Sequence, residues 1–301
     1  MALIGRLTLD QLRVLVTISE AGSFSAAGRS LGRVQSAISQ VIKTLEETQG
    51  VELFDRTGRK PALTPVGRVL AEQARLILAS AGRFESIAAG TRLGLEPSLT
   101  IAIDPLVPTA PLIDSLRALS ETFPNLPVTF STEGVGGAER RLRARSASLA
   151  FCLLLPSVPD DVMAYPLTHL KLVPVAAATH PLMQTRRTLD RADLEAHVQL
   201  VLSDDHGLDG PSYGVVGSRT WRFVDLGRRL DFLLAGFGWC KMPTYVVEPY
   251  LEDGRLVKLD ISDEGISPKG ALPVYAVHLR DRPLGRGGSW LLENLQKRLT
   301  E

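Results

Sequence analysis

The sequence predicts an α+β protein in which a small helical N-terminal part precedes a larger α/β part. Before about residue 93, apolar residues recur at the three- and four-residue spacing of helices, whereas later they form short runs separated by helical stretches. Every tryptophan, tyrosine and cysteine also lies after residue 93. The length of 301 residues is about twice that of a typical domain, so the change in composition across residues 90–97 marks a domain boundary.

Charge and cysteine usage restrict the possible functions. The 34 basic and 33 acidic residues give a net charge of +1, which provides no overall field for nucleic acid or membranes. Residues 1–92 nevertheless carry 12 basic and 8 acidic residues, so any attraction for nucleic acid is local. Cys152 and Cys240 stand in apolar runs without metal-ligand spacing, and neither a signal peptide nor a membrane span is visible. We therefore expect a cytoplasmic protein with inert buried thiols, no cofactor, no metal and no membrane contact.

Three helices are predicted at the N-terminus. The apolar spacing predicts a first helix over residues 9–21, which ends at Gly22. Ser23 is a typical N-cap for a second helix of about two turns, and Gly32 supplies the turn after it. A third helix is expected over residues 35–48. Two short helices joined by a tight turn are typical of a helix-turn-helix.

The third helix carries a polar face, and a basic hairpin follows it. Ala37 and its apolar neighbours are expected to face the core, which leaves amides and hydroxyls on the outer side. Residues 51–54 and 61–63 are predicted as short strands around a turn at 55–60 that holds three cations. Such a helix and hairpin can contact the base edges and phosphates of double-stranded DNA, as in a winged helix-turn-helix. The candidate DNA-binding residues are Ser23, Ser25, Gln35, Ser36, Ser39, Gln40, Lys43, Arg56, Arg59 and Lys60.

A long helix is predicted next, over residues 65–89. Thr64 is a suitable N-cap, and Pro65 fits the first helical position. Large apolar residues that stay exposed would be unfavourable in water, so we expect this helix to pair with its symmetry mate in a homodimer or homotetramer. The stripe that predicts this pairing consists of Val66, Val69, Leu70, Ile77, Phe84 and Ile87.

The second part alternates predicted strands and helices, which favours parallel α/β sheets. Helical stretches at 109–122, 136–145, 190–196, 226–235 and 243–252 lie between or after short apolar runs. The predicted strands are 99–103, 127–131, 149–153, 172–176 and 199–202.

Ligands of parallel α/β sheets bind beyond the carboxyl ends of strands, often at helix N-termini. Trp239 lies in an apolar run and is expected in the core rather than at a ligand. The five histidines are scattered without metal-ligand or catalytic spacing. The candidate effector-binding residues are Asp104, Pro105, Leu106, Val107, Thr132, Glu133, Ser203, Asp204, Gly236 and Phe237.

These motifs together resemble the LysR-type transcriptional regulators. In the N-terminal part, the resemblance rests on residues 21–46, Gly50, 53–56 and 63–67. In the C-terminal part it rests on Phe123-Pro, Glu133-Gly, Leu172-Val-Pro with His180-Pro, residues 235–243 and residues 251–257. The chain departs from the family at Val34, where a Ser or Thr often caps the recognition helix, and at Gln49, where a leucine is usual.

The resemblance implies a domain plan. Residues 1–64 would form the winged helix-turn-helix, and residues 65–92 a linker and dimerisation helix with a hinge. Residues 93–301 would form a two-lobed effector-binding domain like a periplasmic binding protein. Lobe I would span about 93–165 and 269–301, and lobe II about 166–268.

The function that we predict is a sequence-specific DNA-binding regulator that senses a small molecule and catalyses no reaction. Open N–H groups at strand-to-helix turns favour a small organic acid as the effector. One alternative is a small-molecule-binding or enzymatic α/β protein whose N-terminal helices serve only for association. Another is a regulator whose cleft no longer binds a ligand.

Overall fold

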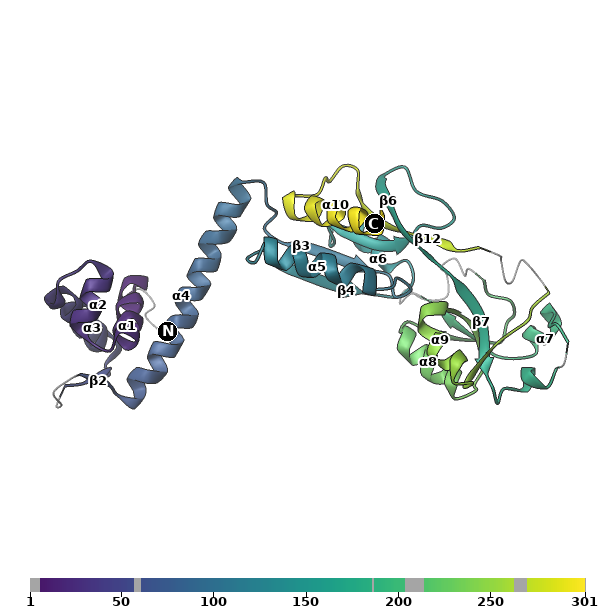
Figure 1. The fold of residues 1–301 in the computed structure, drawn as a ribbon, viewed down its shortest axis with the longest axis horizontal. Helices are drawn as coiled ribbons and strands as arrows, with labels where there is room; N and C mark the ends of the chain where they lie inside the picture. Colours follow the sequence, from purple (N-terminus) through teal and green to yellow (C-terminus); the bar gives the residue numbers. More distant parts are fainter. Residues whose placement is uncertain (1–5, 57–60, 186, 204–213, 263–269, 301) are drawn as a thin grey trace. The chain divides into compact units, whose positions relative to one another are not determined.

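The computed structural model describes residues 6–56, 61–185, 187–203, 214–262 and 270–300. The chain divides into two compact units, residues 1–89 and 90–301 (Figure 1). Each unit has its own apolar core. In the part of the chain that is described, no helix is long and apolar enough to cross a membrane.

The N-terminal unit is a three-helix bundle with a small hairpin and a long helix. The three predicted helices are confirmed, and the third extends to Gln49. The hairpin strands are shorter than predicted, because pairing begins at Phe54 and only two residues of each strand pair. Ala37 is exposed instead of facing the core. The elements are α1 (Leu9–Ala21), α2 (Phe24–Leu31), α3 (Gln35–Gln49), β1 (Phe54–Asp55), β2 (Ala62–Leu63) and α4 (Pro65–Arg92).

The long helix α4 starts where the sequence predicts and continues to Arg92. The Thr64 side chain accepts a hydrogen bond from the Gly67 N–H at 2.9 Å, so it is the helix N-cap. Small residues of α4, Ala71 and Ala74, lie in the core of the N-terminal unit. Leu70 also packs there, so it does not belong to an outward stripe as predicted.

The second unit contains two five-stranded sheets. The first sheet has the order β4-β3-β5-β12-β6 and the second has the order β11-β7-β10-β8-β9. The strands of the first sheet are β3 (Leu99–Ile103), β4 (Val128–Thr132), β5 (Leu149–Leu153), β6 (Val162–Leu170) and β12 (Leu272–Leu279). Those of the second are β7 (Leu172–Ala177), β8 (Gln199–Leu202), β9 (Thr220–Phe223), β10 (Trp239–Pro243) and β11 (Leu256–Lys258).

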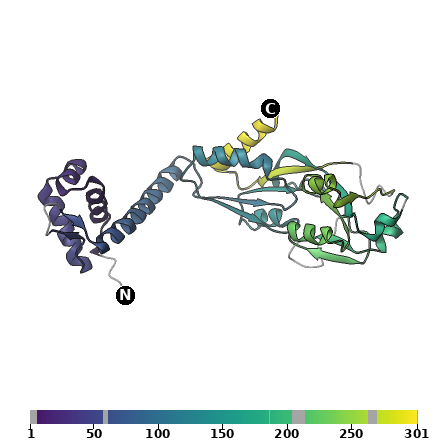
Figure 2. The ribbon, with the colours of Figure 1, turned by 60° about the horizontal axis from the view of Figure 1, so that its bottom comes forward.

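Helices cover both faces of each sheet. The helices are α5 (Ala110–Thr122), α6 (Gly137–Arg143), α7 (Arg191–Glu195), α8 (Leu226–Leu234), α9 (Thr244–Glu252) and α10 (Arg286–Thr300). On the first sheet, α5 and α10 lie side by side on one face and α6 packs on the other (Figures 1 and 2). On the second sheet, α8 and α9 share one core, whereas α7 packs on the opposite face. This two-lobed α/β arrangement confirms the predicted fold class.

The prediction of parallel sheets is only partly right. β3 runs parallel to β4 and β5, and β8 runs parallel to β9 and β10. However, β12 is antiparallel to β5 and β6, and β7 is antiparallel to β10 and β11. The chain passes from β6 of the first sheet to β7 of the second through Lys171 alone. Sequence reasoning missed the strands β6, β9, β10, β11 and β12.

Candidate DNA interface and effector site

The turn between α2 and α3 is fixed by local hydrogen bonds and by close packing. The Ser23 side chain accepts from the Ala26 N–H at 3.1 Å, which caps α2 as predicted. A Cβ atom on Gly28 would lie 2.7 Å from the Arg33 carbonyl oxygen, so only glycine fits there. Arg33 also forms a bidentate ion pair with Asp10, with N–O distances of 2.8 and 2.9 Å. The turn therefore holds α3 in a defined orientation against α1 and α2.

The predicted polar face lies on the outside of α3. Gln35, Ser36, Gln40 and Lys43 are exposed, and Ser39 is half-buried. The apolar side of the same helix buries Ile38, Ile42 and Leu45 in the core of the unit. The structure thus gathers five of the predicted DNA-binding residues on one surface: Gln35, Ser36, Ser39, Gln40 and Lys43.

The start of α3 has no side-chain cap. Val34 occupies the N-cap position without a side-chain hydrogen bond, and its own side chain is 69% exposed. Helix N-termini carry partial positive charge and unpaired N–H groups, which suit a phosphate oxygen. The other two predicted serines lie on or before α2, where Ser23 is a structural cap. Ser25 is exposed and accepts a hydrogen bond from Arg29 at 2.9 Å.

A carboxylate of α3 organises the start of the hairpin. Glu46 accepts hydrogen bonds from the N–H groups of Leu53 and Phe54 at 2.8 and 3.2 Å. The same carboxylate pairs with Arg56 at 2.8 Å, and half of the Arg56 side chain remains exposed. Arg59 and Lys60 lie outside the described residues, so only one of the three predicted hairpin cations is located. Glu46 had no assigned role from sequence, because a glutamate on a helix is usually a solvated surface residue.

The effector candidates after β3 lie in a largely buried loop that Asp104 holds by hydrogen bonds. Asp104 is 1% exposed, and its two carboxylate oxygens accept from the N–H groups of Leu106 at 2.9 Å and Gly136 at 3.3 Å. Burial raises the pKa of the Asp104 carboxyl, although these two hydrogen bonds act in the opposite direction. Asp104 therefore ties the loop after β3 to the loop after β4. Leu106 and Val107 are buried beside it, and Pro105 is half-buried.

The remaining effector candidates differ in their contacts and in their exposure to solvent. Glu133 forms an ion pair with Arg141, and Thr132 is exposed at the end of β4. In the second lobe, the Ser203 N–H donates to the Phe223 carbonyl at 2.8 Å. Asp204 lies outside the described residues.

Phe237 belongs to an exposed aromatic group. Its ring centroid is 5.3 Å from those of Trp221 and Phe232. Gly236 ends the turn that precedes Phe237, and its φ is +79°. A residue with a side chain would adopt this φ only with strain. Trp239 is fully buried and donates to the Leu194 carbonyl, which confirms its prediction as a core residue.

One hydrogen bond joins the two lobes near the ends of these strands. The Tyr245 hydroxyl of α9 donates to the Leu106 carbonyl at 3.3 Å. Burial raises the pKa of this phenol, and the nearby Asp104 adds to the effect. Sequence reasoning missed Tyr245, because a tyrosine at the start of a helix carries no pattern that distinguishes it.

The thiols and imidazoles do not form a reactive cluster. Cys152 and Cys240 are fully buried, and burial raises the pKa of both thiols. The rings of His180 and His197 lie 5.0 Å apart, but His180 accepts a backbone hydrogen bond from Leu182. Among the described residues, no group of three or more His, Cys, Asp or Glu side chains could hold a metal ion.

A polar helix face beside a hairpin, followed by a two-lobed α/β unit, defines a DNA-binding regulator with a ligand-binding domain. Two family models match this chain. Residues 9–68 match the model described as "Bacterial regulatory helix-turn-helix protein, lysR family", and residues 92–300 match the "LysR substrate binding domain". The chain therefore belongs to the LysR family of transcriptional regulators.

Individual relatives agree with this assignment. The chain is 32% identical to the probable HTH-type transcriptional regulator YhaJ of Escherichia coli K12, over 97% of this chain and 96% of the relative. It is 28% identical to the HTH-type transcriptional regulator AceR of Acinetobacter baumannii, over 96% of each chain. The solved structure of a Corynebacterium glutamicum OxyR mutant, in which a serine replaces a cysteine and H2O2 is bound, is similar at 25% identity and a TM-score of 0.56. That match covers 97% of this chain and 94% of the other. The chain is thus a sequence-specific DNA-binding transcriptional regulator whose C-terminal domain senses a small-molecule effector.

Proposed function

We propose that α3 reads base edges in the major groove and that the hairpin contacts the flanking phosphates. The observation that carries this proposal is the exposed row of amides and hydroxyls on α3, from Gln35 to Lys43. A glutamine side chain can form a bidentate contact with the N6 and N7 atoms of adenine, and hydroxyl groups can accept hydrogen bonds from, or donate them to, several bases. Arg56 contacts phosphate, together with Arg59 and Lys60 of the same hairpin. Ser23 and Ser25 lie at the start of α2, where such proteins meet the DNA backbone.

We also propose that α4 mediates formation of a homodimer or homotetramer. Five large apolar side chains of this helix are exposed: Val66, Val69, Leu76, Ile77 and Phe84. Phe84 alone is 74% exposed, which is unfavourable in water unless a second chain covers it. A two-fold symmetric dimer presents two copies of α3, and its DNA site is then an inverted repeat with half-sites about one helical turn, or a multiple of it, apart. On this proposal residues 1–64 bind DNA, 65–92 dimerise, and 93–301 bind the effector.

For the effector we propose a small organic acid held between the lobes. The candidate residues are those named above at strand ends, from Asp104 to Val107, at Thr132 and Glu133, at Ser203 and Asp204, and at Gly236 and Phe237. Asp104 is the buried carboxylate among the described residues of this set, and it already accepts two backbone N–H groups, so it offers little attraction to a cation. Helix α5 has no side-chain cap at its start, so the partial positive charge of this helix end favours a carboxylate there.

The protein acts in the cytoplasm on this proposal, and it catalyses no reaction. A mobility-shift titration with the DNA upstream of its own gene tests the assignment. We expect one discrete complex at nanomolar protein that unlabelled specific DNA removes and a scrambled duplex does not. Equal competition by both duplexes would contradict specific binding. If the N-terminal helices served only for association between protein chains, no protein–DNA complex would form.

A further inference from the structure

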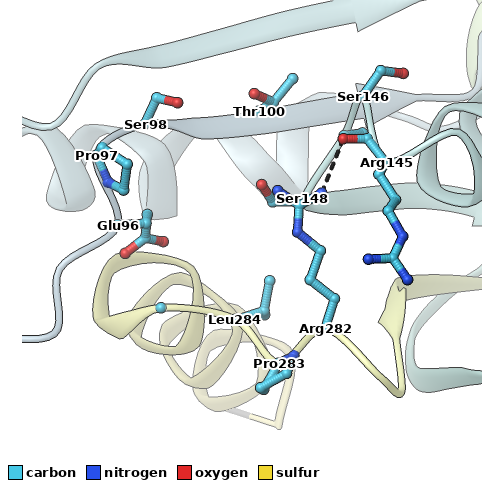
Figure 3. A pocket seen from close by; sticks show the side chains of 12 residues that line it. Glu96, Pro97, Ser98, Thr100, Arg145, Ser146, Ser148, Arg282, Pro283 and Leu284 are labelled. Carbon is cyan, nitrogen blue, oxygen red and sulfur yellow. Dashed lines mark hydrogen bonds between the residues drawn. The ribbon is translucent and has the colours of Figure 1, made fainter.

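A cavity in the first lobe lies apart from the predicted effector residues. It has a volume of about 180 Å³ and is partly open to solvent, and none of the predicted effector residues lines it. Three segments form its walls (Figure 3): residues 96–100 at the start of β3, residues 145–148 before β5, and residues 282–285 between β12 and α10. The cavity is therefore at the amino ends of β3 and β5, opposite the strand ends where the effector is proposed to bind.

Two arginines span one end of this cavity. Arg282 reaches from the turn after β12 toward the loop before β5, where it donates to the Arg145 carbonyl at 2.9 Å (Figure 3). The Arg145 side chain extends in the opposite direction and forms an ion pair with Asp281 at 2.6 Å. This Arg145 side chain is 63% exposed. Hydroxyl groups of Ser98, Thr100 and Ser148 belong to the same lining. Guanidinium forks beside hydroxyls are the groups that bind carboxylate and phosphate oxygens.

Glu96 is the acidic residue of the lining, and its charge is already engaged. Its two carboxylate oxygens accept from the N–H groups of Gly287 and Gly288 at 2.8 and 2.7 Å, at the start of α10. A carboxylate at a helix N-terminus is stabilised by the helix dipole. In Figure 3, Glu96 lies at the end of the cavity away from the two arginines. At the arginine end the Asp281 carboxylate offsets the charge of one guanidinium, so Arg145, Arg282 and Asp281 together keep one net positive charge.

Arg145 has a backbone conformation that favours another residue. Its φ of +57° makes it the one non-glycine residue with positive φ in the described chain. It follows the end of α6, where the Arg145 N–H donates to the Leu142 carbonyl and the Ser146 N–H to the Arg141 carbonyl, both at 2.9 Å. Glycine is the usual residue at this position after a helix. The backbone conformation of this turn does not require an arginine side chain.

We propose that this cavity is a second ligand site, which binds the phosphate or carboxylate group of a small polar molecule between Arg145 and Arg282. The ligand also contacts residues 96–98, which join α4 to β3. The site is distinct from the effector site between the lobes, and its existence does not depend on which effector binds there.

Calorimetric titration of the full-length protein at constant ionic strength tests the proposal, with inorganic phosphate and citrate as separate ligands. We expect at least one of the two to bind with a Kd below about 10 mM, and R145G and R282Q each to weaken that binding roughly tenfold or more. Binding of phosphate alone identifies a phosphoryl group, and binding of citrate alone identifies a carboxylate. R145G relieves the positive φ, so its melting temperature stays at or above that of the wild type and lost binding is not unfolding.

Two controls make the result decisive. R228Q removes an exposed arginine of α8 that pairs weakly with Asp231 at 3.9 Å, and it should bind as the wild type does. S203W obstructs the region between the lobes and should also leave this binding intact. The proposal is overturned if neither anion binds. It is equally overturned if R145G and R282Q bind like the wild type, or if S203W abolishes binding while they retain it.

Discussion

The carboxylate of Glu46 lies 2.8 Å from the guanidinium of Arg56, and it connects α3 to the hairpin. Because Glu46 also accepts two backbone N–H groups at Leu53 and Phe54, the hairpin leaves α3 in a fixed direction. The Glu46 side chain thus helps to fix the position of the hairpin relative to the polar face of α3. The edge-to-face contact of Phe24 with Phe54, with centroids 5.0 Å apart, supports the same junction from α2.

Glu46→Ala should therefore lower the free energy of unfolding of the N-terminal unit by about 1–3 kcal/mol, because two backbone donors lose their acceptor. The neighbouring Glu47→Ala is the matched control, since Glu47 is exposed and its distance to Lys43 is 3.8 Å. We expect Glu47→Ala to change stability by less than about 0.5 kcal/mol. Urea denaturation followed by circular dichroism measures both. Equal effects of the two substitutions would show that Glu46 does not hold the hairpin.

Two glycines of α4 should respond to alanine in opposite directions. A Cβ atom on Gly67 would lie 2.1 Å from the Leu53 carbonyl oxygen, which is backbone and cannot move away easily. Gly67→Ala should therefore destabilise the protein by roughly 1–3 kcal/mol. Gly82 has open space around it, so Gly82→Ala should stabilise the helix by about 0.5–1 kcal/mol. Thermal unfolding of the two variants compares them directly, and a stabilising Gly67→Ala would contradict the packing of α4 on the hairpin.

Asp104 should make stability depend on pH. Its pKa is raised in the folded protein by burial, so the folded state holds this proton more tightly than the unfolded state does. The contribution is fully present below the unfolded pKa of about 3.9 and is lost as pH rises through the folded pKa. Asp104→Asn removes the titration, and its stability relative to the wild type should rise with pH across that window. Denaturation of both proteins at a series of pH values measures the difference, and a constant difference would show that Asp104 does not titrate there.

The buried thiols should make this chain insensitive to peroxide. A thiolate is the reactive species, and the raised pKa of Cys152 and Cys240 keeps both as neutral thiols at pH 7. A thiol reagent should label neither cysteine of the native protein within minutes and both after unfolding. DNA affinity should be the same before and after millimolar hydrogen peroxide. A change in DNA affinity after peroxide that Cys152→Ser or Cys240→Ser abolishes would contradict this expectation. By this expectation, the chain differs in its response to peroxide from the similar OxyR mutant whose structure has H2O2 bound.

The local pattern predicts the N-terminal elements well because caps and turns there depend on neighbouring residues. Ser23, Thr64 and the glycine at position 32 act as predicted, and α1 to α3 follow their apolar spacing. The strands β6 and β12 were missed, because neither the half-buried β6 nor the mostly buried β12 shows a clear apolar–polar alternation. Their pairing also joins segments that lie more than 100 residues apart in the sequence. Gly28 and Gly67 were missed because a close approach to a carbonyl is visible only in three dimensions.

The candidate sites were predictable to different degrees. The outward face of α3 follows from helical periodicity, so Gln35 and Lys43 could be placed from sequence. Asp104 could be located at a strand end, but its two backbone hydrogen bonds depend on a loop 32 residues later. Arg145 and Arg282 are 137 residues apart and no motif links them, so the cavity between them could not be predicted.

The hairpin and α3 should differ in how they affect binding. If Arg56 contacts phosphate as proposed, Arg56→Ala should weaken binding to specific and scrambled DNA by similar factors. It should also reduce the slope of log K against log salt concentration by about one unit. Fluorescence anisotropy at several salt concentrations measures the slope. An unchanged slope would show that Arg56 remains paired with Glu46 when DNA is bound.

The most direct test of the account is the specificity ratio of Gln35→Ala, which is the affinity for the inverted-repeat operator divided by that for a scrambled duplex. Both affinities are measured by fluorescence anisotropy at one fixed salt concentration. If α3 reads the bases, the substitution weakens operator binding by roughly 1–3 kcal/mol, leaves scrambled DNA unaffected and lowers the ratio about 5- to 150-fold. An unchanged ratio, with equal operator affinity for the variant and the wild type, would contradict the assignment of α3 as the recognition helix.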